Sequence, residues 1–126
     1  MSIVYKIHIS IFVVVNNFII FAKSIIIAYM DLIIDKVCAY FNVDKEKVIA
    51  KSNKQDISIV RNYIYYILHY EYNFSIGNIA KRFGRCRREI NYRVSEIKYR
   101  IKYFPTNKQE YQAIIDDLNK KKEVEY

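Results

Sequence analysis

The chain has 126 residues, a formal charge of +8, two glycines and one proline. A chain of this length forms one domain, or one domain with an appendage. Because sheet-rich folds need many turn residues, this composition excludes a predominantly β fold and predicts an all-α protein with short polar loops.

The first thirty residues are apolar and differ from the rest of the chain. Residues 8–22 read HISIFVVVNNFIIFA without a formal charge, and SIIIAYM follows Lys23. Together they are long enough to cross a bilayer, although Lys23 and the pair Asn16-Asn17 interrupt a clean span. Three interpretations remain open: a membrane anchor within residues 8–29, a helix or strand packed on the domain, and an upstream extension absent from a product translated from Met30.

Helical periodicity begins at Asp31, which we expect to cap a helix running to Phe41. A short helix follows Asn42, and Asp56 is expected to cap a longer helix over Ile57 to Tyr72. The inward face of the first helix is predicted to contain Leu32, Ile33, Val37, Tyr40 and Phe41. The stripe of the long helix contains Ile59, Tyr63, Tyr66, Ile67 and Tyr70, and this spacing favours a core face over a platform for stacking bases.

Pro105 is expected to end the helix before it, because the residue preceding a proline avoids helical dihedrals. Residues 105–126 then form an amphipathic helix with a basic tail. Its inward residues are predicted to be Tyr111, Ile114, Ile115 and Leu118.

Nearly all the excess charge lies between Lys81 and Lys102, where nine basic residues face two acidic ones. This clustering is typical of a surface that binds DNA, RNA or an acidic membrane, whereas a solvated helix face carries both signs in similar number. Part of the charge supports the helix itself, since Glu89–Arg93 and Glu96–Arg100 have i, i+4 spacing.

Enzymatic motifs are not apparent. Cys38, Cys86, His8 and His69 are isolated in the sequence, so no metal site or disulfide framework is predicted, and a reduced cytoplasmic setting fits. The chain has no GxxxxGK[ST] phosphate loop and no catalytic pattern. We therefore expect a non-enzyme without a cofactor and without an ATPase of its own.

Residues 75–94, SIGNIAKRFGRCRREINYRV, contain both glycines and match a helix-turn-helix. Ser75 can cap a first helix that ends at Phe83. Counting from Ile76 as position one, the small Ala80 is fifth, Gly84 is ninth at the turn, and the apolar Ile90 is fifteenth between the helices.

In this motif the start of the second helix reads bases in the major groove. The predicted base-reading residues are Arg85, Arg87, Arg88, Asn91 and Tyr92. Lys81 and Arg82 are predicted to face phosphates.

From about Leu32 to Ile101 the chain resembles the C-terminal DNA-binding domain (domain IV) of the bacterial replication initiator DnaA. VCAYFNVDKEKVIAKS resembles the opening helix and the Lys-Ser pair of the family, here Lys51-Ser52, and ISIVRN resembles the segment ending in Arg-Gln. FSIGNIAKRFG resembles Leu-Ser-x-x-x-Ile-Gly-x-x-Phe-Gly, with Ala80 at the glycine position. The resemblance implies that Arg61 contacts the minor groove and that Lys51 and Ser52 lie near the DNA backbone.

The chain departs from the family at the residues that read bases. Gly-Gly-Arg-Asp-His-Thr-Thr-Val is replaced by Gly84, Arg85, Cys86, Arg87, Arg88, Glu89 and Ile90. We therefore expect the fold and the binding of double-stranded DNA to be kept and the target sequence to differ.

The sequence thus predicts an apolar segment over residues 1–30, a helix-turn-helix domain over 31–104 and a C-terminal helix and tail over 105–126. The expected role is replication or transcription control at the nucleoid. Two alternatives remain: a membrane-tethered or structural interaction protein whose basic helix meets acidic lipids or an acidic partner, and RNA binding through Arg85–Arg93 and exposed tyrosines.

Overall fold

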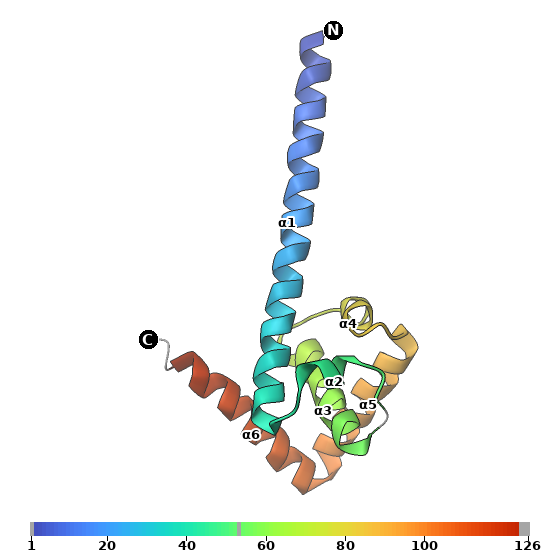
Figure 1. Cartoon of the computed structure of the whole chain (residues 1–126), viewed down its shortest axis with the longest axis vertical. Helices are drawn as coiled ribbons and strands as arrows, with labels where there is room; N and C mark the ends of the chain where they lie inside the picture. The colour runs from blue at the N-terminus through green and yellow to red at the C-terminus, as the bar shows by residue number, and fades with distance from the viewer. Residues whose placement is uncertain (1, 53, 124–126) are drawn as a thin grey trace. The chain divides into compact units, whose positions relative to one another are not determined.

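The computed structural model describes residues 2–52 and 54–123, and the regular structure in these ranges is entirely helical (Figure 1). In chain order the elements are α1 (Ser2–Phe41), α2 (Lys45–Ile49), α3 (Gln55–Tyr66), the π-helical η1 (Ile67–Glu71), α4 (Ile76–Phe83), α5 (Arg87–Tyr103) and α6 (Pro105–Glu123). The predicted all-α class is confirmed. The chain divides into two compact units, Met1–Asp31 and Leu32–Tyr126, which are described separately.

The first unit consists of the N-terminal part of α1. The prediction that Asp31 caps a new helix is wrong, because α1 continues through Asp31 to Phe41. Its sequence contains no glycine or proline, so no residue in it breaks a helix. From Ile7 to Tyr29 the large apolar side chains that the structure describes are exposed, and Phe12, Phe18 and Phe21 are each more than 60% exposed. By length and composition alone, α1 can cross a membrane within Ser10–Phe41.

The second unit is organised around α3, which packs against α2, α5 and η1, while α5 packs against α4 and α6. Its core is formed by buried side chains of all these helices and of the end of α1. They include Ile33, Ile34, Val37, Val48, Val60, Ile64, Leu68, Ile79, Phe83, Ile90, Val94, Ile97, Ile114 and Leu118. Burial of so many branched apolar side chains supplies the main stabilisation of the unit.

Several predicted core positions are wrong. Leu32 and Tyr40 are exposed, and so are Ile59 and Tyr70, at 43% each. Because α3 has neighbours on most sides, its buried face extends from Ile57 round to Tyr65, and its narrow solvent side includes Ile59. The wider turn of η1 then changes the direction of the following side chains.

One further predicted helix start differs, and the predicted break at Pro105 is confirmed. The helix predicted to begin after Asp56 begins at Gln55, so Asp56 lies in its first turn, and no side chain caps α3. Pro105 does separate two helices: α5 ends at Tyr103 and Pro105 opens α6, where its fixed φ suits the first turn.

The last helix is fastened to α3 by polar contacts. Tyr63 donates its hydroxyl hydrogen to Glu110 at 3.1 Å and accepts a hydrogen bond from Asn107 at 3.0 Å. Tyr111 donates to Glu71 on η1. Residues 124–126 of the predicted basic tail lie outside the described residues.

Candidate nucleic-acid interface

The first helix of the predicted motif, α4, is capped as expected. The Ser75 hydroxyl accepts a hydrogen bond from the backbone N–H of Asn78 at 3.1 Å. Ile79 and Phe83 are buried, and Ala80 is 5% exposed. The local sequence is sufficient to define this helix, because an N-cap serine and apolar spacings of three and four both act within one or two turns.

Gly84 ends α4 in the left-handed conformation, with φ 61° and ψ 36°. The N–H of Arg85 then donates to the Ala80 carbonyl at 3.0 Å, which closes the end of the helix. A Cβ built on Gly84 meets nothing within 4 Å. Positive φ is therefore the reason for glycine here, and lack of space is not.

The second helix of the motif, α5, begins at Arg87, directly after the extended residue Cys86. Ile90 is buried between the helices, as predicted, and Val94 and Ile97 are buried on the same inner side of α5. Arg88, Asn91 and Tyr92 are exposed, and the i, i+3 and i+4 spacing places them on one outward face. We call these three residues the outward face of α5.

Basic residues of other elements border this motif. Lys81 is exposed near the end of α4, with the half-buried Arg82 beside it. The exposed Lys51, from the connection between α2 and α3, lines a depression of about 360 Å³ together with Gly84, Arg85, Cys86 and Glu89. Residues distant in sequence are thus brought to the turn.

Arg87 lies against the start of α4. A Cβ on Gly77 would lie 2.9 Å from Arg87 Nη2, so the guanidinium covers the glycine backbone closely. Gly77 leaves room for this close approach of Arg87, which is ten residues away in the sequence, although the flexible guanidinium can move away from a Cβ at this position.

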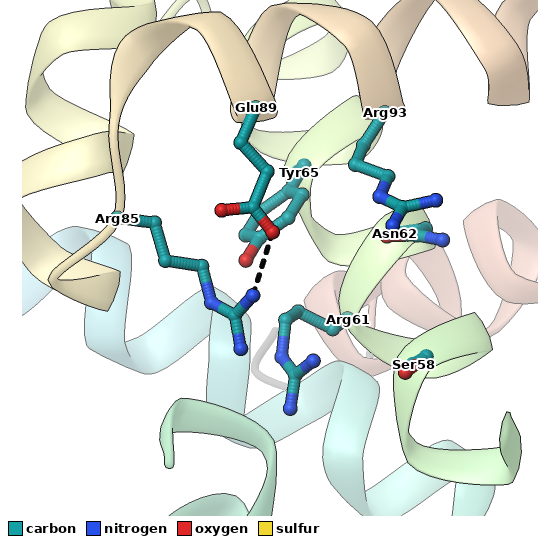
Figure 2. Close-up of a pocket in the computed structure, with 7 residues that line it drawn as sticks. All are labelled: Ser58, Arg61, Asn62, Tyr65, Arg85, Glu89 and Arg93. Atoms are coloured by element: carbon teal, nitrogen blue, oxygen red, sulfur yellow. Dashed lines mark hydrogen bonds and ion pairs between the residues drawn. The ribbon is translucent and has the colours of Figure 1, made fainter. Parts of the chain in front are cut away.

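Arg85, predicted to reach bases, turns inward instead. Its Nη1 donates to Glu89 Oε1 at 2.7 Å, and its side chain is only 11% exposed (Figure 2). The predicted Glu89–Arg93 pair is replaced by this Arg85–Glu89 pair, while Arg93 and Arg100 both contact Glu96.

Arg61 is the buried charged residue of the core, at 3% exposure. Its Nε donates to the Val48 carbonyl at 2.7 Å, and its Nη2 donates to the carbonyls of Ala50 and Ser52 at 2.9 and 3.0 Å. Burial, and then the charge of Arg85, lower the pKa of Arg61 from its ordinary value. The resemblance implied a minor-groove contact for Arg61, whereas in the structure its guanidinium donates to three backbone carbonyls.

Ser52 therefore contributes its carbonyl to Arg61, and its hydroxyl accepts from the Lys54 N–H at 3.4 Å. The adjacent Lys51 is held in a loop whose carbonyls converge on one guanidinium. The sequence does not predict this role of Arg61, because its acceptor carbonyls lie nine to thirteen residues earlier in the chain and only the tertiary fold brings them to the guanidinium.

Comparison with known proteins agrees with this geometry. A family model described as the bacterial DnaA protein helix-turn-helix matches residues 30–97. The chromosomal replication initiator protein DnaA of Oleidesulfovibrio alaskensis is 28% identical over 65 residues, which are 52% of this chain and 14% of that protein. The chain therefore spans a small part of the relative's length. With a capped α4, a left-handed glycine turn and α5 in the matched region, the chain belongs to the bacterial DnaA helix-turn-helix family.

Proposed function

We propose that the protein binds double-stranded DNA through α4 and α5, with α5 in the major groove. The observation that carries the proposal is the outward face of α5. Arg88, Asn91 and Tyr92 are exposed at the start of the second helix of a helix-turn-helix, where this motif reads bases. The family membership supports it independently.

The residues proposed to bind DNA fall into two groups, those that contact base edges and those that contact phosphates. Arg88 and Asn91 carry the groups that pair with guanine and adenine edges, and Tyr92 offers a ring for base or sugar contact. Arg87 is exposed beside them and can supply a further contact.

A second group of residues is assigned to the phosphates of the DNA backbone, whose contacts position the protein without reading sequence. This group consists of Lys81, Arg82 and the loop that contains Lys51 and Ser52.

Arg61 and Arg85 take indirect roles in this proposal. Arg61 holds the loop that presents Lys51, through three backbone carbonyls. Arg85 packs beside α5 in its ion pair with Glu89. Because both guanidinium groups are directed inward, sequence recognition depends on the outward face.

The target sequence is proposed to differ from that of the relative. Arg88 and its neighbours stand where the family has Asp-His-Thr-Thr, so the donor and acceptor groups offered to base edges are different. The relative is named a chromosomal replication initiator. We propose that this chain acts in replication or transcription control by occupying a site on DNA.

The test compares two variants in fluorescence anisotropy titrations against several duplexes. Arg88→Ala should lower the affinity for the preferred duplex about tenfold or more and reduce discrimination, since one good base contact is worth about 1–3 kcal/mol. Lys81→Ala should weaken all duplexes alike and reduce the salt slope by about one unit.

Lys108→Ala is the matched control, because it removes one positive charge from an exposed position on α6, outside the motif. It should leave affinity nearly unchanged. Absence of duplex binding by the unmodified protein at low salt contradicts the proposal, and so do equal effects of all three substitutions.

A second candidate function, attachment to a membrane, is favoured by the exposed apolar side chains of α1. The large apolar side chains that the structure describes between Ile7 and Tyr29 are exposed, and the helix is long and apolar enough to span a bilayer. Membrane fractionation of the full chain tests the idea. Removal of residues 1–29 should release the protein from the membrane fraction, and an unchanged distribution would contradict a tether.

A further inference from the structure

A small cavity lies between α3 and α5, on the side of α5 next to its outward face. It is lined by Ser58, Arg61, Asn62, Tyr65, Arg85, Glu89 and Arg93 and has a volume of about 60 Å³ (Figure 2). A cavity needs about 10–15 Å³ of this kind of volume to hold one water molecule. The cavity therefore has room for a small polar group.

The lining has more hydrogen-bond donors than acceptors. The Tyr65 hydroxyl, together with Nε and Nη2 of Arg85, is buried without a hydrogen-bond partner. Tyr65 itself is 1% exposed. A buried donor without an acceptor costs stability, so these three groups together indicate that an acceptor belongs here.

The charge of the lining points to an anion. Arg61, Arg85 and Arg93 contribute three positive charges, and Glu89 contributes one negative charge. Of these three arginines, Arg85 is the one that donates to Glu89, through Nη1. Arg93 contacts Glu96 instead. The mutual repulsion of buried arginines is also seen in the pKa of Arg61, which burial and then Arg85 lower.

Tyr65 is in the protonated form, in which its hydroxyl can donate a hydrogen bond to an anion. Burial raises the pKa of Tyr65 to about 12, so the phenol keeps its hydrogen at neutral pH. A tetrahedral oxyanion with several acceptor oxygens can receive the hydrogens of Tyr65 and of Arg85 at once, and Arg–phosphate hydrogen bonds are among the strong ones.

We propose that this cavity is a binding site for a phosphate oxyanion held by Tyr65 and Arg85, with Arg61 and Arg93 supplying further positive charge. The phosphate comes either from the DNA backbone beside α5 or from a free phosphate ion. The free-ion form does not depend on the proposed DNA binding, so the two proposals can fail separately.

The first experiment titrates the DNA-free full chain with inorganic phosphate at low ionic strength, followed by calorimetry, with chloride as the reference anion. The unmodified protein should bind one phosphate per chain. Tyr65→Phe removes a single hydroxyl and keeps the ring that packs edge-to-face on Phe83 at 4.9 Å. It should weaken phosphate binding about tenfold, because hydrogen bonds to charged groups are strong.

A second variant and a control keep the result interpretable. Glu89→Gln removes the one negative charge of the lining and should tighten phosphate binding severalfold. Lys108→Ala removes one exposed positive charge on α6, outside the lining of the cavity, and should leave phosphate binding unchanged. Near-ultraviolet circular dichroism verifies that each variant keeps its packed tyrosines.

The proposal is overturned if phosphate does not bind saturably, or if folded Tyr65→Phe and Glu89→Gln bind it like the unmodified protein. A second experiment identifies the source by competing phosphate against duplex DNA. Competition, with a uniform loss of affinity for all duplexes in Tyr65→Phe, supports the DNA backbone. Binding of phosphate without competition supports the free ion.

Discussion

The two glycines of the chain should respond to alanine with opposite signs. Gly84 has φ 61°, and a Cβ there meets no atom within 4 Å. The substitution Gly84→Ala therefore costs only backbone conformational energy, which is roughly 1–2 kcal/mol for a left-handed residue. Alanine offsets part of this loss by reducing the freedom of the unfolded chain, so we expect a net loss of about 1 kcal/mol.

Gly77→Ala is the matched substitution in the first turn of α4. Its Cβ would approach Arg87 Nη2 at 2.9 Å, but that atom is the end of a flexible, exposed side chain that can move away. Alanine is a better helix former than glycine by up to about 1 kcal/mol, so the variant should be more stable than the unmodified protein.

Urea unfolding followed by near-ultraviolet circular dichroism measures both effects, since this signal reports the buried tyrosines. Gly84→Asn serves as a further comparison, because asparagine tolerates positive φ and should lose less than alanine. An unchanged stability of Gly84→Ala would refute the left-handed turn. A loss above about 3 kcal/mol would refute the open surroundings, because it exceeds the backbone cost.

The other predictions concern Arg61 and Tyr65. Arg61→Met leaves three carbonyls without their donor and should lower the free energy of unfolding by about 3 kcal/mol or more in urea titrations; normal stability with lost DNA binding would instead indicate a direct groove contact. For Tyr65, whose pKa burial raises to about 12, the folded state keeps the proton that the unfolded state loses near pH 10. The contribution of Tyr65 to the free energy of unfolding is thus present below pH 10 and is lost as the pH rises toward 12. At pH 11 the free energy of unfolding of the unmodified protein should have fallen by about 1.4 kcal/mol relative to that of Tyr65→Phe. Parallel pH profiles of stability for the two proteins would contradict this.

The helix-turn-helix could be predicted because its determinants are local. Ser75 caps the next residues, Gly84 permits the turn, and Ile90 follows at a fixed spacing. Each acts within a few residues, so the sequence alone specifies the two helices and the exposed start of α5.

The parts that could not be predicted depend on distant neighbours. Arg61 donates hydrogen bonds to carbonyls nine to thirteen residues earlier in the chain. The side chain of Arg85 can point outward or toward Glu89, and the packing of α5 on α3 determines which of the two it does. The polar periodicity that begins at Asp31 predicts a helix start there. The helix continues through it, since a single aspartate does not end a helix that no glycine or proline interrupts.

The central claim is that the outward face of α5 reads DNA sequence. Selection of bound duplexes from a random library, with the full chain and with Arg88→Ala, tests it most directly. The unmodified protein should enrich one sequence motif, and Arg88→Ala should bind DNA but lose the preference at one or two positions of that motif. Enrichment of no motif, or of the same motif by both proteins, would contradict the claim.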